Sequence, residues 1–322
     1  MRGAGDRNGN CFQQEGDDVE NKGQMIDQSL KNRSCMVTGA SSGIGREIAL
    51  GLACKSATVF LVCRDPGRGR SAQDYIRRQS GNADVHLLLA DLSAQKQVRS
   101  LAEDFKRQHD VLHLLVNNAG VIMGRRVLTG DGIEMTFAVN YLACFLLTNL
   151  LLDVLKEGAP SKIVNLTTSL HRMARLDFDN LQGEKSFGRE SAYSRSKLAV
   201  ILFTYELAMR LEGTGITVNC VCPGATRSGI WSHSSRTIDA FFHALMKGPE
   251  EGARLPIHLA CSSGVEGLTG RYFETKQHLR ITRVNLKGTE SKSSPVTYDR
   301  DTAARLWKLS EQLTGLAGSP QA

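Results

Sequence analysis

The chain has 322 residues, 41% of them hydrophobic and 23% charged, which is enough for one large globular domain with a sizeable core. Its eight cysteines are scattered without a Cys-x-x-Cys unit, so no metal site is expected. The net charge of +7 is compatible with a solvated basic surface, an anionic ligand or a membrane surface, but no Lys/Arg-rich block with interleaved aromatics points to nucleic acid.

Residues 1–31 are polar and are expected to form a disordered leader, without an apolar stretch long enough for a signal peptide or a membrane anchor. Short apolar runs then alternate with amphipathic stretches. The predicted strands are residues 35–38, 57–63, 85–90, 112–116, 162–167 and 217–222. The predicted helices are residues 46–53, 71–79, 94–108, 133–155, 192–211 and 249–260.

Apolar strands that alternate with helices indicate a parallel sheet covered on both faces. We therefore predict a single doubly wound (Rossmann) α/β domain over residues 32–285. Residues 286–322 form a C-terminal extension with a predicted amphipathic helix at 301–313. The apolar run at 141–155 is too short and too polar to span a membrane, and suits a buried helix or one that packs against another subunit.

A glycine-rich turn follows the first predicted strand and opens the first predicted helix. Glycine allows a backbone to approach a pyrophosphate or to take a positive φ, and a helix N-terminus offers free N–H groups to phosphate. This setting predicts a dinucleotide cradle. Its expected cofactor-binding residues are Gly39, Ser41, Ser42, Gly43, Ile44 and Gly45.

The end of the second predicted strand favours NADP(H) over NAD. A carboxylate there would bind the adenosine ribose hydroxyls, but the chain has Cys63 followed by Arg64, and Asp65 comes only afterwards. Arg64 can pair with a 2′-phosphate, and Arg46, just after the last glycine, is a second candidate for the same group.

Four motifs together resemble the short-chain dehydrogenase/reductase family. They are the glycine-rich turn at 38–45, Asn-Asn-Ala-Gly at 117–120, Tyr-Ser-Arg-Ser-Lys at 193–197 and Pro-Gly at 223–224. The resemblance implies that Asp91 and Leu92 lie against the adenine. It also implies cofactor contacts further along the chain from Asn118, Ala119, Gly120, Pro223, Gly224, Thr226 and Ser228.

Tyr193 and Lys197 are the expected catalytic pair, and the resemblance also places both beside the cofactor. Carbonyl reduction needs a proton donor beside the developing alkoxide, and the reverse reaction needs a base. Because the two residues are four apart on a predicted helix, they share one face. We expect the Lys197 cation to lower the pKa of the Tyr193 phenol.

The catalytic hydroxyl is a departure from the family pattern. The family usually has a serine about 25 residues before the tyrosine, at the end of the preceding strand, and Thr168 stands there in this chain. Ser169 is the alternative, although one residue along an extended strand points to the opposite face. By resemblance, Asn140 holds a water beside the lysine in a proton relay. His171, just beyond, is expected at the surface rather than in the pocket.

Within the family, the chain is most similar to the retinol dehydrogenase-like branch, through residues 63–65, 177–185, 198–211 and 268–273. That similarity implies an NADP(H) enzyme acting on a small apolar retinoid or lipid-derived carbonyl or alcohol, and a homo-oligomer. The apolar residues within 228–249 suit a substrate lid or plain core packing. We expect a cytoplasmic protein, with peripheral contact at the ER membrane left open by the basic charge.

Two alternatives remain open on sequence alone. One is a broad-specificity carbonyl or steroid reductase with the same machinery. The other is an NADP-binding regulatory or scaffold protein with weakened catalysis, suggested by threonine in the serine position.

Overall fold

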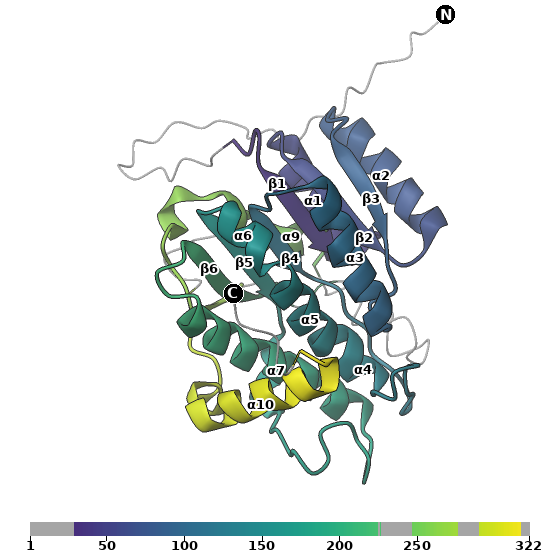
Figure 1. The fold of residues 1–322 in the computed structure, drawn as a ribbon, viewed down its shortest axis with the longest axis vertical. Helices are drawn as coiled ribbons and strands as arrows, with labels where there is room; N and C mark the ends of the chain where they lie inside the picture. The colour runs from purple at the N-terminus through teal and green to yellow at the C-terminus, as the bar shows by residue number, and fades with distance from the viewer. Residues whose placement is uncertain (1–28, 225, 227–246, 276–289, 317–322) are drawn as a thin grey trace, which may run out of the picture.

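The computed structural model describes residues 29–224, 226, 247–275 and 290–316. Within them, seven parallel strands form one sheet in the order β3-β2-β1-β4-β5-β6-β7 (Figure 1). This confirms the predicted doubly wound sheet. The strands are β1 (Ser34–Thr38), β2 (Thr58–Cys63), β3 (Val85–Leu89), β4 (Leu114–Asn117), β5 (Ser161–Leu166), β6 (Ile216–Cys222) and β7 (Arg271–Glu274).

The inner strands are apolar throughout because both of their faces are covered. Along β1, for example, Met36 packs into one hydrophobic cluster and Val37 into another on the opposite face. The edge strand β3 differs, since only Val85 is fully buried and Leu89 is exposed. The strand order reverses between β1 and β4, and ligands of such sheets bind beyond the carboxyl ends of the strands at that point.

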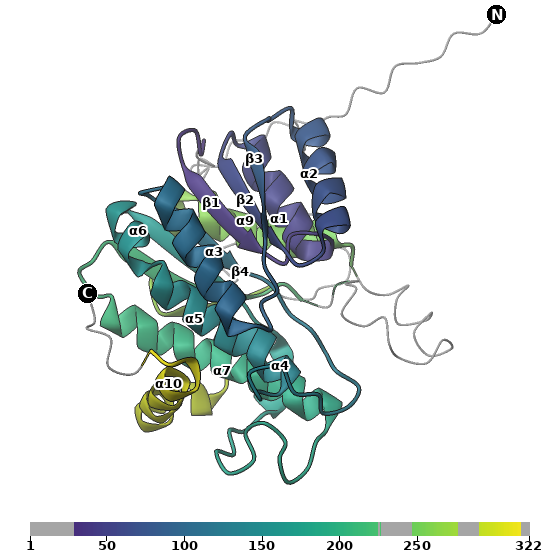
Figure 2. The same ribbon diagram turned by 45° about the vertical axis from the view of Figure 1, so that its right-hand side comes forward.

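Helices lie in two layers. One face of the sheet carries α1 (Gly43–Cys54), α2 (Pro66–Ser80) and α9 (Pro249–Cys261). The other face carries α3 (Gln95–Gln108), α5 (Ala143–Leu150) and α7 (Arg189–Arg210), with α10 (Arg300–Thr314) outermost (Figure 2). Shorter turns complete the described part of the chain: α6 (Leu152–Glu157), a 3₁₀ turn after β5 (Ser169–Met173) and two more (Ser263–Val265 and Pro295–Tyr298).

The helical region predicted over 133–155 is present, but it does not form one regular helix. This region is divided into α4 (Met135–Phe137), a π-helical segment (Ala138–Leu142), α5 and α6. Glu134 opens it by accepting the backbone N–H groups of Thr136 and Phe137 at 2.9 and 2.8 Å. A π segment shifts the side chains that follow it around the helix axis, and such segments are frequent at functional sites.

The C-terminal helix α10 covers the apolar face of α5 and α7. Trp307 packs against Phe145 and Phe203, with ring centroids 5.0 and 5.8 Å away. The Tyr141 hydroxyl shares a hydrogen bond of 2.7 Å with Ser310. The apolar run at 141–155 therefore does not need another subunit to bury this face.

Both ends of the described chain are attached to the sheet domain. At the N-terminal side, Leu30 is buried and its N–H donates to the Lys55 carbonyl at 2.9 Å. Leu30 belongs to the leader predicted to be disordered over residues 1–31, so that prediction is wrong at its C-terminal end, while residues 1–28 lie outside the described residues. Among the helices that are described, none is long and apolar enough to cross a membrane.

Candidate active site

The turn between β1 and α1 exposes the start of α1. Ser42 precedes the helix without a side-chain cap, and no acidic residue lies in the first turn. The first N–H groups of α1 therefore have no competing anion within their own turn. Gly39 and Gly43 have φ of +67° and +57°, which other residues rarely adopt.

The carboxyl end of β4 holds this turn in place. The Thr38 hydroxyl accepts the N–H groups of Asn118 and Ala119 at 3.0 and 3.1 Å. In return, the Asn118 amide donates to the Thr38 and Gly39 carbonyls at 2.8 and 3.3 Å. The two segments expected to border the cofactor thus form one rigid unit.

This cradle fits a dinucleotide phosphate. A side chain at Gly45 would bring its Cβ to 2.5 Å from the Gly39 carbonyl oxygen, so only glycine fits at this position of the turn. A Cβ at Gly43 would instead meet nothing within 4 Å. The backbone is therefore packed on its inner side and open on its outer side, as close approach of a phosphate requires.

The arginines beside the cradle differ from the sequence expectation. Arg46 forms an ion pair with buried Glu47 at 2.7 Å and lies over the ring of Tyr75, 4.3 Å from its centroid. Arg68, which we did not single out, donates to the Ser42 hydroxyl at 3.1 Å. Arg64 is exposed at the end of β2. Arg68 could have been found from its place in the first turn of the helix that follows β2.

Three further expected contacts lie at the same edge of the sheet, and a fourth cannot be placed. Asp91 accepts the N–H and hydroxyl of Ser93 at 2.9 and 2.7 Å, which shapes the turn before α3. Gly224 has a φ of +80° just beyond β6. Thr226 is buried and packs near Gly252 of α9. Ser228, like most of the expected lid, lies outside the described residues.

Tyr193 and Lys197 are buried on α7 against the carboxyl end of β5. The Lys197 ammonium donates to the Leu166 carbonyl at 3.0 Å. One residue later, the Thr167 hydroxyl donates to the Lys197 carbonyl at 2.9 Å. These two bonds join the middle of α7 to the strand that leads into Thr168.

Burial has the largest effect on the pKa values of Tyr193 and Lys197. It lowers the pKa of Lys197 to about 8. It also raises the pKa of Tyr193 above its ordinary value, with a smaller contribution from Cys222. The expectation that Lys197 lowers the pKa of Tyr193 is not met, because burial and Cys222 both raise that pKa. The phenol is therefore protonated at neutral pH.

Asn140 lies in the π segment and joins three parts of the site. Its side-chain oxygen accepts the Val121 N–H at 2.7 Å, and its amide donates to the Val121 carbonyl and the Ser196 hydroxyl, both at 3.0 Å. Ser196 in turn donates to the Tyr193 carbonyl at 2.7 Å. Asn140 thus ties the segment after Gly120 to the catalytic face of α7.

Thr168 and Ser169 stand where β5 passes into a 3₁₀ turn. Thr168 precedes the turn in extended conformation, and its hydroxyl accepts the Leu170 N–H at the long distance of 3.4 Å. The expectation that His171 is exposed is wrong, because its side chain is fully buried beneath this turn. The C-terminal segment, 123 residues further along the chain, covers it.

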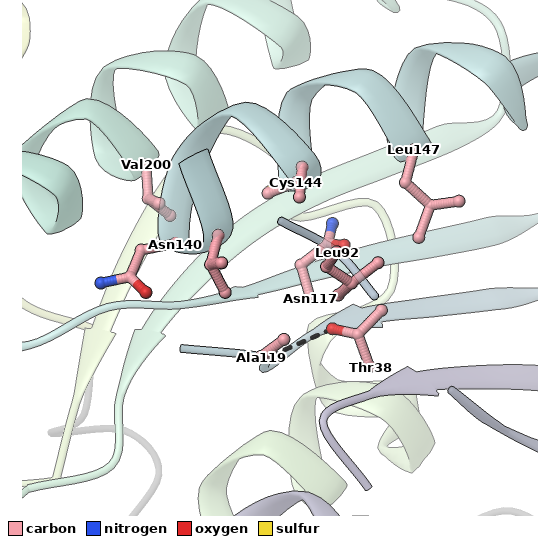
Figure 3. A pocket seen from close by; sticks show the side chains of 10 residues that line it. Thr38, Leu92, Asn117, Ala119, Asn140, Cys144, Leu147 and Val200 are labelled. Carbon is pink, nitrogen blue, oxygen red and sulfur yellow. Dashed lines mark hydrogen bonds between the residues drawn. The ribbon is translucent and has the colours of Figure 1, made fainter. Parts of the chain in front are cut away.

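Asn117 and Asn140 border a small cavity between the sheet and α5 (Figure 3). Its volume is about 10 Å³, room for roughly one water molecule. Thr38 and Cys144 complete its polar side, while Leu147 and Val200 close its apolar side. A substrate does not fit here, and it must enter from the carboxyl ends of the strands instead.

A family model described as short chain dehydrogenase matches residues 33–239. The chain belongs to the short-chain dehydrogenase family. Retinol dehydrogenase 11 of Mus musculus is 43% identical, over 89% of this chain and 88% of its own. Retinol dehydrogenase 12 of Homo sapiens is 40% identical over the same shares.

Solved structures agree with this assignment. An uncharacterized protein from Mycobacterium paratuberculosis superposes with a TM-score of 0.71 at 29% identity, covering 90% of this chain and 96% of its own. A Pseudomonas aeruginosa RhlG/NADP active-site complex has a TM-score of 0.62 at 30% identity, covering 76% and 95%. The predicted similarity to retinol dehydrogenases is confirmed. This dehydrogenase is thus an oxidoreductase of alcohol and carbonyl groups.

Proposed function

We propose that this dehydrogenase uses NADP(H) to interconvert an alcohol and an aldehyde or ketone of a retinoid or lipid-derived apolar substrate. The observation that carries the proposal is the burial of Tyr193 and Lys197 where β5 ends, at the same sheet edge as the glycine-rich cradle. The names of the retinol dehydrogenase relatives support the substrate class. The RhlG/NADP complex and Arg68 at the cradle support the cofactor.

The cradle would hold the pyrophosphate, and the bound nicotinamide would supply the hydride. Tyr193 is the proton donor to the carbonyl oxygen in reduction, and its protonated phenol is the form this step requires. Lys197 stabilises the phenolate that remains. In alcohol oxidation the same phenolate accepts the proton.

The hydroxyl that bonds the carbonyl oxygen is assigned to Thr168, with Ser169 as the alternative. Thr168 continues the extended backbone of β5, whereas Ser169 begins the 3₁₀ turn. Threonine retains the hydroxyl, and its added methyl restricts χ1. Asn140 would support the arrangement through Ser196 and Val121.

Separate reactions of NADPH with all-trans-retinal, a medium-chain aldehyde and a steroid ketone test this function. Hydride transfer is measured as the loss of the reduced nicotinamide absorbance band at about 340 nm. We expect turnover of retinal or the aldehyde with NADPH and much slower turnover with NADH. Tyr193→Phe should abolish turnover while NADPH still binds. Turnover of the steroid alone would favour a steroid reductase, and turnover of all three substrates would favour a broad-specificity carbonyl reductase.

Tight NADPH binding without turnover of any substrate would contradict the proposal and favour a binding-only role. In that case restoring serine with Thr168→Ser would show whether threonine is the cause.

Two finer expectations also stay proposals. A homo-oligomer is implied by the family resemblance, and α10 already covers Phe145 and Phe203 on the α5 and α7 face. Cytoplasmic location with peripheral contact at the ER membrane is supported by the net charge of +7.

A further inference from the structure

A buried histidine lies directly behind the strand end that carries the catalytic hydroxyl. His171 is the third residue of the 3₁₀ turn that follows Thr168, and its side chain is fully buried. Its Nδ1 is 2.6 Å from the Thr168 carbonyl oxygen. Its Nε2 is 3.1 Å from the backbone nitrogen of Ser294.

These two partners determine the protonation of the ring. The Ser294 N–H can only donate, so Nε2 must accept, and the ring proton lies on Nδ1, where it donates to the Thr168 carbonyl. A second proton on Nε2 would face the Ser294 N–H. Burial lowers the pKa of His171, which agrees with a neutral ring. The bond to the Thr168 carbonyl raises this pKa by less, and Arg172 and Glu274 have still smaller and opposite effects.

The 3₁₀ turn that contains His171 also contacts strand β7 and the segment 291–294. Arg172 donates to both carboxylate oxygens of Glu274, at 3.1 and 2.7 Å, and to the Lys292 carbonyl at 3.1 Å. The rings of His171 and Tyr272 make an edge-type contact, with their centroids 5.2 Å apart. The Ser291 N–H donates to the Tyr272 carbonyl at 2.9 Å. Strand β7 and the segment 291–294 therefore enclose the turn together.

The backbone carbonyl of Thr168 is held by a shorter hydrogen bond than its side-chain hydroxyl. Among the described residues, the Thr168 hydroxyl has only a long bond to the Leu170 N–H, at 3.4 Å, so that bond holds it weakly. The short bond from His171 instead fixes the peptide plane between Thr168 and Ser169. That peptide joins the two residues that carry the candidate hydroxyls.

We propose that His171 is a positioning residue of this dehydrogenase, which couples the Thr168 carbonyl to the Ser294 N–H and so makes the C-terminal segment a support of the active site. The proposal rests on the function proposed above. It assigns a role to a side chain that does not itself reach the substrate. It also explains why a segment so far along the chain packs against the catalytic strand end.

His171→Phe keeps an aromatic ring at this position and removes both hydrogen bonds. We expect kcat to fall by about tenfold to a hundredfold, the size of effect that a small misplacement of a catalytic group produces. NADPH affinity should be unchanged, because none of the bonds lost belongs to the cradle. The matched control is His113→Phe, since His113 also joins distant segments, through Ser34, but at the amino ends of the strands. It should leave kcat unchanged.

A double-mutant cycle separates positioning from general loss of structure. Thr168→Ala and Ser169→Ala first show which of the two residues supplies the catalytic hydroxyl. His171→Phe is then combined with that alanine variant, and residual rates are measured at high enzyme concentration. If His171 acts through that hydroxyl, it should cause no further fall there. The proposal would be overturned if His171→Phe lowered kcat equally in the wild type and in the variant without the catalytic hydroxyl. It would also be overturned if His113→Phe lowered kcat as much as His171→Phe.

Ser294→Pro provides a second test should His171→Phe fail to fold. Ser294 has φ −69° and ψ 150°, which proline adopts, so the substitution chiefly removes the N–H that His171 accepts. It should lower kcat in the same hydroxyl-dependent way. Wild-type turnover with unchanged kcat in Ser294→Pro and His171→Phe overturns this inference alone, whereas NADPH binding without wild-type turnover overturns the proposed function and the inference with it.

Discussion

Arg46 and Arg68 both lie near the cofactor cradle, and their partners distinguish them. The guanidinium of Arg46 is held by Glu47 and Tyr75. The guanidinium of Arg68 reaches the Ser42 hydroxyl, and its backbone N–H is held by Asp65 at 2.7 Å. Arg68 is therefore anchored beside the cradle, which supports the proposal that it binds, with Arg64, the 2′-phosphate of NADP(H).

Arg68→Ala should raise the KM for NADPH about tenfold, as expected when a charge-assisted hydrogen bond is lost. The KM for NADH should change little, since NADH lacks the 2′-phosphate. Steady-state kinetics with both cofactors would measure this, with Arg70→Ala as the control because Arg70 is exposed on the same helix. Equal losses with NADPH and NADH would contradict the assignment.

At the scale of elements, the junction between β1 and α1 depends on close backbone packing. Asn118 bridges this junction to β4, and Gly45 lies directly against that bridge. A side chain at Gly45 would meet both the Asn118 amide and the Gly39 carbonyl. The cradle therefore depends on the sheet register that brings β4 beside β1.

Gly45→Ala should lower the free energy of unfolding by about 1–3 kcal/mol, the usual range for overpacking, and weaken NADPH binding. Chemical denaturation and cofactor titration by fluorescence would measure the two effects. Gly130→Ala is the matched control, because its Cβ would meet nothing within 4 Å. Unchanged NADPH affinity in Gly45→Ala would show that the turn is not the phosphate site.

At the scale of the whole molecule, α10 completes the helical layer over α5 and α7. Trp307 is its main anchor, buried against Phe145 and Phe203 and covered by Arg210, whose guanidinium lies 4.0 Å from the Trp307 ring. The helix is capped by Asp299, which accepts the N–H groups of Asp301 and Thr302. The same C-terminal part of the chain supplies Ser294 to His171.

Trp307→Ala should lower the free energy of unfolding by about 3–5 kcal/mol, because a large buried aromatic is replaced by a cavity. Urea denaturation followed by circular dichroism would measure it, with Lys308→Ala, an exposed neighbour on α10, as the control. An effect no larger than that of Lys308→Ala would show that α10 contributes little to the stability of the domain.

Local patterns in the sequence were sufficient for much of the fold. Apolar runs predicted six of the seven strands, because strands buried on both faces are apolar along their whole length. The glycine-rich turn, the 117–120 motif and the Tyr193–Lys197 spacing identified the family and the candidate site, since each is a short pattern with its own chemistry. The roles assigned to these residues stay predictions until they are measured.

The sequence by itself determined the sheet, the cradle and the catalytic helix, because those depend on hydrophobic periodicity and on contacts close in the chain. Only the tertiary structure decided the rest. The π segment that presents Asn140, the burial of His171, the bond from Arg68 to the cradle and the covering of α5 and α7 by α10 each depend on a partner elsewhere in the chain. No local pattern encodes such a partner, because the fold alone brings the two segments together.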